Sequence, residues 1–86
     1  MYGRTGDDMR YEVLKFENIR SLRIDLGYTQ QQIADYLNVK QNTYSQYELG
    51  VLNYPIDALL KLADFYHVSV DYLLGRTAVK TPYPKK

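Results

Sequence analysis

The sequence TQQQIADYLNVKQNTYSQYELG, residues 29–50, contains two short helical patterns separated by a short break. In the first pattern, Thr29 and Gln32 have the spacing at which a threonine oxygen and a glutamine side chain each bond the other's free backbone amide. The apolar residues of this pattern recur at helical spacing: Ile33, Ala34 and Leu37. Asn38 follows, and asparagine is one of the few residues other than glycine that tolerate a positive φ. These features predict a helix that begins after Thr29 and ends at Asn38.

The second pattern predicts a helix over about 41–49 that ends at Gly50. Three apolar or aromatic residues would turn inward from it: Val39, Tyr44 and Tyr47. Its outward positions carry amide and hydroxyl side chains: Gln41, Asn42, Ser45 and Gln46, with Thr43 at the edge. Two such helices joined by a tight turn are typical of a helix-turn-helix motif.

Towards the N-terminus, the sequence predicts one further helix, roughly 17–26. Its apolar residues recur at three- and four-residue steps: Phe16, Ile19, Leu22 and Leu26. Gly27 follows as a left-handed end. Residues 1–15 hold two glycines and charges of both signs, which predicts a flexible or partly ordered extension. Within it, residues 11–16 fit either a short strand or the lead-in to a helix.

Towards the C-terminus, a linker over residues 51–54 precedes two more predicted helices. Pro55 fits the first position of the fourth helix, where a missing backbone N–H costs nothing. The expected buried stripe of this helix is Ile56, Leu59, Leu60, Ala63 and Tyr66. His67 would end the helix with a positive φ rather than bind a metal, because no second ligand accompanies it. Ser69 would cap a fifth helix that closes the core before Gly75.

The length and composition exclude several classes of protein. The chain of 86 residues suffices for one domain with one modest core, and we expect an all-α, compact five-helix domain over residues 16–75. The absence of cysteine excludes disulfides, thiolate metal sites and thiol catalysis, and it fits a cytoplasmic location. No run of about 18 apolar residues occurs, so no membrane-spanning helix is expected.

The formal net charge of +1 conceals an uneven distribution. Residues 18–74 have a balance of −2, from four basic and six acidic residues: Arg20, Arg23, Lys40 and Lys61 against Asp25, Asp35, Glu48, Asp57, Asp64 and Asp71. Residues 76–86 contain no acid and four basic residues: Arg76, Lys80, Lys85 and Lys86. We expect this segment to be a basic, mobile tail that either attracts a polyanion or only aids solubility.

The outward face of the predicted helix over 41–49 has the chemistry to recognise bases. Glutamine and asparagine carry a donor and an acceptor side by side, which lets one side chain bond the N6 and N7 edge of adenine. Serine and threonine adapt to base edges or to phosphates. The alternative is a solvated polar face, which is the ordinary interpretation of an isolated helix with this composition. The preceding capped helix and the tight turn favour the functional interpretation.

From about residue 18 to residue 75, the chain resembles the lambda-repressor-like, Cro/C1 or XRE-type helix-turn-helix family of DNA-binding regulators. The segments that carry the resemblance are IRSLR (19–23), TQ (29–30), IADYL (33–37), QNTYSQYE (41–48), LLKLADFY (59–66) and VSVDYLLG (68–75). The resemblance covers about two-thirds of the chain and implies a five-helix DNA-binding domain.

The resemblance also implies roles for individual residues. Three positions would face base edges: Gln41, Asn42 and Gln46. Three others would contact the phosphate backbone or the groove wall: Gln30, Thr43 and Ser45. In such proteins, the residue matching Gln30 also braces the first residue of the recognition helix, here Gln41. Arg23 and Glu48 would form a structural ion pair.

The sequence departs from the family pattern in three places. Lys40 stands where a serine or threonine usually caps the recognition helix, so the cap is weaker and a cation that can reach phosphate is gained. Asn38 replaces the usual turn glycine. Val51 and Leu52 stand in a linker that often holds lysine or arginine, so nonspecific affinity for DNA should be low unless the tail contributes.

The sequence therefore predicts sequence-specific binding of double-stranded DNA by a transcriptional regulator, most readily a repressor, with no catalytic role, metal or cofactor. Because one recognition helix contacts few base pairs, we expect a homodimer on a two-fold site. Its interface would involve the fifth helix and Val79, or else residues 11–16. Two alternatives use the same fold: a module that binds another protein, favoured by the −2 balance, and an antitoxin that binds both DNA and a toxin.

Overall fold

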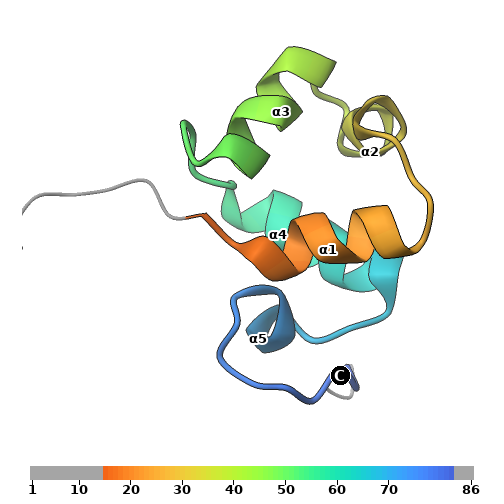
Figure 1. The fold of residues 1–86 in the computed structure, drawn as a ribbon, viewed down its shortest axis with the longest axis vertical. Helices are drawn as coiled ribbons and strands as arrows, with labels where there is room; N and C mark the ends of the chain where they lie inside the picture. Colours follow the sequence, from red (N-terminus) through yellow and green to blue (C-terminus); the bar gives the residue numbers. More distant parts are fainter. Residues whose placement is uncertain (1–14, 83–86) are drawn as a thin grey trace, which may run out of the picture.

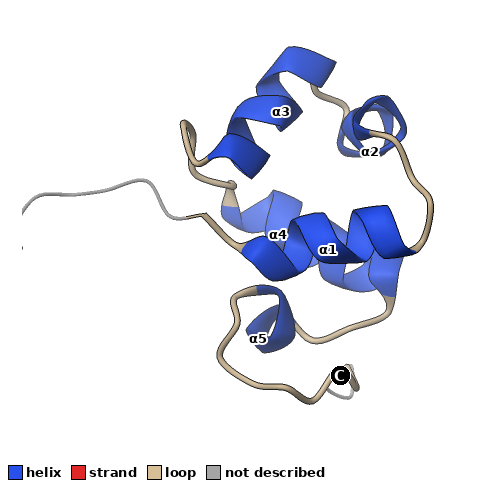
Figure 2. Cartoon of the chain, in the orientation of Figure 1, coloured by secondary structure: helices blue, strands red, loops and turns tan. Residues whose placement is uncertain are grey.

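Five α-helices make up the fold in a computed structural model that describes residues 15–82. In chain order they are α1 (Glu17–Asp25), α2 (Gln30–Leu37), α3 (Gln41–Leu49), α4 (Ile56–Tyr66) and α5 (Val70–Leu73) (Figure 1). No strand occurs among the described residues (Figure 2). The predicted all-α, five-helix architecture is therefore confirmed. The part of the ambiguous segment 11–16 that is described, residues 15 and 16, is neither helix nor strand, and the rest lies outside the described residues.

The helix starts follow from local side-chain chemistry. Thr29 and Gln32 form the predicted capping box of α2, with the Thr29 hydroxyl accepting from the Gln32 amide at 3.1 Å and the Gln32 side chain accepting from the Thr29 amide at 2.8 Å. The Ser69 hydroxyl accepts from the amide of Tyr72 at 3.0 Å and caps α5, as predicted. Pro55 is the N-cap of α4 and not its first residue, so this expected boundary was one residue too early.

The helix ends share one motif. After each helix, the chain takes a left-handed residue, and the next amide bonds a carbonyl five residues back, which satisfies carbonyls that the helix leaves free. The left-handed residues are Gly27, Asn38, Gly50, His67 and Gly75. Asn38 and His67 have φ values of 61° and 59°, which confirms that the sequence ends α2 and α4 without glycine.

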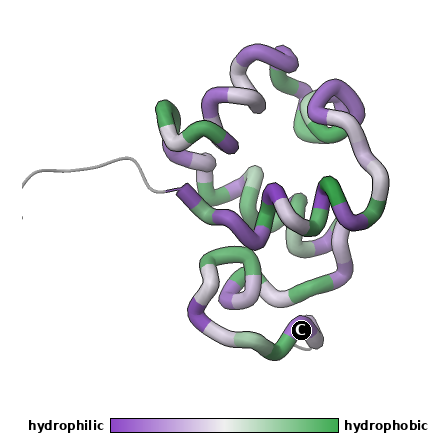
Figure 3. The backbone as a smooth tube through the Cα atoms, viewed as in Figure 1, coloured by the Kyte–Doolittle hydropathy of each residue, from purple (hydrophilic) through white to green (hydrophobic). Residues whose placement is uncertain are grey.

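The core lies where all five helices meet. Helix α2 packs on α3, α5 packs on α4, and α1 contacts both α3 and α5. The most deeply buried large side chains come from every helix: Ile19, Ile33, Tyr44, Leu62 and Leu73. In the hydropathy view, the first turn of α3 is hydrophilic (Figure 3). The polar start of α3 is thus held at the edge of an apolar core.

The buried face of α4 differs from the prediction. Ile56 and Leu60 were expected in the core, but they are 77% and 55% exposed. The residues buried on this helix are Ala58, Leu62, Ala63 and Tyr66. Apolar residues cover all of α4 except the face that carries Asp57, Lys61 and Asp64, so the sequence fits two overlapping apolar stripes. Periodicity alone does not decide which of the two is buried. Leu26, which continued the apolar pattern of α1, is also exposed.

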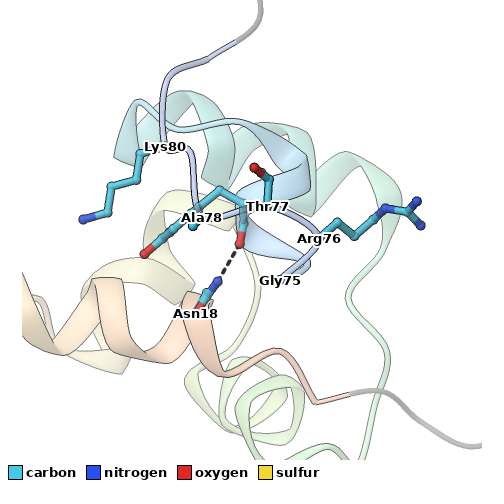
Figure 4. A pocket seen from close by; sticks show the side chains of 7 residues that line it. Asn18, Gly75, Arg76, Thr77, Ala78 and Lys80 are labelled. Carbon is cyan, nitrogen blue, oxygen red and sulfur yellow. Dashed lines mark hydrogen bonds between the residues drawn. The ribbon is translucent and has the colours of Figure 1, made fainter.

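The segment after α5 folds back along that helix. The carbonyl of Lys80 accepts from the amide of Ser69 at 2.9 Å, and the Lys80 ammonium lies 5.6 Å from the ring centre of Tyr72. On the other side, the side-chain amide of Asn18 donates to the carbonyl of Tyr72 at 2.8 Å. In Figure 4, the side chains of Arg76 and Lys80 point away from each other. These contacts place residues 76–82 against α5; the mobility of the tail stays a prediction, and residues 83–86 lie outside the described part.

Candidate nucleic-acid interface

Helix α3 presents one polar face and buries the other. Gln41 and Asn42 are exposed at its start, and Leu49 is exposed at its end. Three predicted contact residues are half-buried: Thr43, Ser45 and Gln46. The buried residues of the helix are Tyr44, Tyr47 and Glu48. The predicted base-facing set is therefore uneven, because Gln41 and Asn42 project further into solvent than Gln46.

The start of α3 has no side-chain cap. Lys40, the N-cap residue, has extended backbone (φ −72°, ψ 149°) and makes no capping bond, as its chemistry predicts, and its side chain is exposed. Backbone amides at the start of a helix carry a partial positive charge and can donate to a phosphate. The start of α3 therefore offers donors and a cation at the same place.

Arg23 of α1 and Glu48 of α3 form a buried, two-pronged ion pair. Arg23 Nε donates to Glu48 Oε2 at 2.6 Å, and Arg23 Nη2 donates to Glu48 Oε1 at 2.9 Å. Their side chains are only 12% and 2% exposed. Two further donors reach the same carboxylate: the Tyr44 hydroxyl at 2.6 Å and Gln30 Nε2 at 3.1 Å. Arg23 Nη1 also donates to the carbonyl of Tyr28 at 2.9 Å, which ties this pair to the turn before α2.

The ionised state of Glu48 is favoured by these donors. Burial raises the pKa of the Glu48 carboxyl, but the hydrogen bonds from Arg23, Tyr44 and Gln30 outweigh burial and leave the pKa below its ordinary value. The hydrogen bond to Glu48 likewise raises the pKa of Arg23 against the effect of burial. Burial and the hydrogen bond to Glu48 raise the pKa of Tyr44, so its hydroxyl stays a donor. A charged carboxylate that accepts from four side-chain donors thus lies behind the polar face of α3.

Gln30 connects this buried carboxylate to the exposed start of α3. Its Nε2 donates to Glu48, while its Oε1 accepts from Gln41 Nε2 at 2.8 Å. The sequence and its resemblance placed Arg23 beside Glu48 and Gln30 beside Gln41, and these two contacts are present. They did not suggest that Gln30 also contacts Glu48. Tyr44 was expected only in the core, although its spacing of four residues from Glu48 put both on one helix face.

Two cations near this site were not among the expected contact residues. Lys15 and Arg20 line a groove between α1 and α3 that also contains Gln30 and Glu48. Both are exposed, and Lys15 also pairs with Glu17 at 3.3 Å. They lie before the two-helix stretch in sequence, so only the packing of α1 against α3 reveals them.

Apolar residues are exposed on the linker and on the outer face of α4. On the linker, Val51 is 56% exposed and Leu52 is 40% exposed. They continue from Leu49 towards Ile56 and Leu60. In the C-terminal segment, Val79 is 62% exposed. These side chains contribute exposed apolar surface outside the amide-rich start of α3.

Neither a metal cluster nor a membrane-spanning helix is found in the part of the chain that the structure describes. Within residues 15–82, no three His, Cys, Asp or Glu side chains lie close enough together to hold a metal ion. His67 is exposed and ends α4. None of the described helices is long and apolar enough to cross a membrane.

Comparison with known proteins gives a consistent picture. A family model described as helix-turn-helix matches residues 19–73. Relatives include the HTH-type transcriptional regulator ImmR of Bacillus subtilis, 41% identical over 63 residues that cover 73% of this chain and 50% of ImmR. The cryptic phage CTXphi transcriptional repressor RstR of Vibrio cholerae is 36% identical over 57 residues, which cover 66% of this chain and 51% of RstR. The chain thus spans about half the length of these relatives.

A solved structure supports the same fold. A transcriptional regulator from Listeria innocua superposes with a TM-score of 0.68 at 30% identity, covering 88% of this chain and 64% of that one. The match extends beyond the two-helix stretch to most of the chain.

Proposed function

This chain belongs to the helix-turn-helix family of the Cro/C1 or XRE type, and we propose that it binds double-stranded DNA through α3 and acts as a transcriptional repressor. The observation that carries the proposal is the fixed, exposed amide of Gln41 at the polar start of α3. The names of the relatives add that regulators and a phage repressor share this sequence pattern. No catalytic role and no cofactor are proposed.

The amide side chains of α3 would recognise the bases. Gln41 and Asn42 are the most exposed of them and would contact base edges in the major groove, with Gln46 reaching from a half-buried position. Because Gln41 is held by Gln30, its rotamer is set before DNA arrives, which lowers the entropy lost on binding.

Backbone contacts would position α3 in the groove. Lys40 and the first backbone amides of α3 would bind one phosphate. Thr43 and Ser45 would contact the groove wall or the DNA backbone. Gln30 uses one N–H for Glu48, which leaves its second N–H to donate to a phosphate. Lys15 and Arg20 place two cations in the groove that contains Gln30, although residues 18–74 as a whole have a balance of −2.

The active form would be a homodimer in the cytoplasm. A recognition helix of nine residues contacts few base pairs, so specificity requires a second copy on a half-site about 34–36 Å away. Exposed Val79 and the half-buried apolar residues of α5 are the proposed interface. The runner-up, residues 11–16, lies largely outside the described residues.

The second candidate function is a protein-interaction module, and one observation favours it. Val51 and Leu52 expose apolar surface where a DNA-binding linker would carry cations, and Ile56 at the start of α4 is exposed as well. In this alternative the fold is retained, but a protein replaces DNA as the ligand. An antitoxin would combine both kinds of binding.

Selection of bound sequences from random duplexes, followed by fluorescence anisotropy at several salt concentrations, tests the proposal. We expect an enriched two-fold site and an affinity that falls with salt, with a logarithmic slope of about −0.9 per phosphate contacted. Failure to enrich any sequence, together with no salt-dependent binding, would contradict DNA recognition and favour the protein-interaction module. Enrichment of a single half-site would contradict the homodimer alone.

A further inference from the structure

Three residues from two helices form a continuous hydrogen-bonded path from the core to the proposed DNA surface. We call this path the polar bridge; it consists of Glu48, Gln30 and Gln41. Glu48 Oε1 accepts from Gln30 Nε2 at 3.1 Å, and Gln30 Oε1 accepts from Gln41 Nε2 at 2.8 Å. Glu48 is 4% exposed, whereas Gln41 is an exposed residue. The bridge therefore links a buried charge to the first residue of α3.

The chemistry of the bridge allows only one direction of hydrogen-bond donation, from Gln41 to Gln30 and from Gln30 to Glu48. An ionised carboxylate accepts hydrogen bonds and donates none. A glutamine amide has an accepting end and a donating end, so Gln30 must turn its NH₂ group towards Glu48. The carbonyl oxygen of Gln30 then faces Gln41, and Gln41 must donate to it from its own NH₂ group. If the Gln30 amide were reversed, its oxygen would lie against the Glu48 oxygen in a partly buried site, and this contact between two acceptors is costly.

The direction of the bridge decides what Gln41 offers to solvent. In the observed direction, Gln41 turns its carbonyl oxygen and one remaining N–H outward. An acceptor beside a donor complements the N6 and N7 edge of adenine. In the reverse direction, the carbonyl oxygen would be held by Gln30, and two N–H donors would face outward. Two donors complement the O6 and N7 edge of guanine, which has only acceptors.

We propose that Glu48 is a positioning residue that sets the hydrogen-bond direction of Gln30 and Gln41, and thereby makes Gln41 select adenine over guanine. The consequence for DNA rests on the proposed function, but the direction of the bridge is a property of the free protein. Arg23 donates to both oxygens of Glu48 and Tyr44 donates to Oε2, which keeps the carboxylate in place. Glu48 thus influences a base contact that it does not touch.

The first test removes the carboxylate without leaving a buried charge. The double variant Arg23→Met/Glu48→Met replaces the ion pair with apolar side chains of similar length, a change that folded proteins often tolerate. Tyr44→Phe is the matched control, because it removes a donor to Glu48 Oε2 and leaves Oε1 and Gln30 untouched.

The readout without DNA is the exchange rate of the side-chain amide protons of Gln30 and Gln41, measured by NMR. In the wild-type protein and in Tyr44→Phe, we expect one protected proton on each glutamine. In Arg23→Met/Glu48→Met, exchange of both should accelerate by about two- to tenfold, the range that one hydrogen bond provides. Unchanged protection of Gln41 in the double variant would overturn the proposal.

The second test reverses the bridge. Arg23→Glu/Glu48→Lys keeps an ion pair but places a group that only donates beside Gln30. Selection from random duplexes should then move the base opposite Gln41 from adenine towards guanine, with the preference changing by about fivefold or more. An unchanged adenine preference in folded protein would overturn the proposal. If no variant and no wild-type protein bound DNA while the exchange pattern followed expectation, the proposed function would be wrong and the role of Glu48 in the bridge would stand.

Discussion

Helices α3 and α4 fill the same core in opposite ways. Helix α3 is polar outside, and on its inner face the hydroxyl of Tyr44 and the carboxylate of Glu48 are both hydrogen-bonded. Helix α4 is apolar on both sides: it buries Leu62 and Tyr66 and exposes Ile56 and Leu60. Hydrogen bonds therefore fix the orientation of α3, whereas nonpolar packing fixes that of α4. A helix that must present particular atoms to a base needs the first arrangement, whereas a helix that mainly fills the core can rely on the second.

Removing the carboxylate from α3 should have the largest effect on stability. Glu48→Ala leaves the Arg23 guanidinium buried without its partner, and breaking a buried ion pair in this way costs about 3–5 kcal/mol. Urea unfolding followed by circular dichroism measures this loss. If Glu48→Ala lost no more free energy of unfolding than a substitution at an exposed position of α4, the claim that hydrogen bonds fix α3 would be contradicted.

Acid should lower the free energy of unfolding, because it protonates Glu48. The pKa of Glu48 is lower in the folded protein than its ordinary value of 4.5, so the folded state binds the proton less well than the unfolded chain does. The contribution of Glu48 is therefore fully present above that ordinary value and is lost as the pH falls through the lower folded pKa. Unfolding free energies from neutral pH down to about 3 should fall less steeply in Arg23→Met/Glu48→Met than in the wild-type protein. Equal slopes would contradict the assignment to Glu48.

The buried tyrosines of the two helices offer a matched pair of substitutions. The Tyr44 hydroxyl donates to Glu48 at 2.6 Å, so Tyr44→Phe should cost about 1.5–3 kcal/mol, the range for a bond to a charged group. The Tyr66 hydroxyl is buried with no hydrogen-bond partner among the described residues, so Tyr66→Phe should be neutral or stabilising. Thermal unfolding of both variants gives the comparison. Similar losses would mean that the Tyr66 hydroxyl is also hydrogen-bonded in solution.

The smallest effect on monomer stability is expected on the outer face of α4. Ile56→Lys and Leu60→Lys alter exposed positions, so each should change the unfolding free energy by less than about 0.5 kcal/mol. Sedimentation of the same variants shows whether this face is used between subunits. A large loss of stability at low protein concentration would place these residues in the core, as the sequence pattern suggested.

The sequence predicted those features that depend on local chemistry. The capping box at Thr29 and the left-handed residues Asn38 and His67 depend only on the side chains around them. The buried face of α4 could not be predicted in the same way, because apolar residues cover more than half of that helix and only packing selects the stripe that contains Leu62. The contact between Gln30 and Glu48 joins residues 18 positions apart on different helices, so no local pattern signals it.

The most direct test of α3 as the recognition helix is the binding of Gln41→Ala to DNA, measured by fluorescence anisotropy. The selected site and a scrambled duplex of equal length are compared at one salt concentration, with Tyr66→Phe as the control for a change confined to the core. We predict a loss of about 1–3 kcal/mol on the selected site and little change on the scrambled duplex. Equal losses on both duplexes, or no loss on either, would contradict base recognition by Gln41.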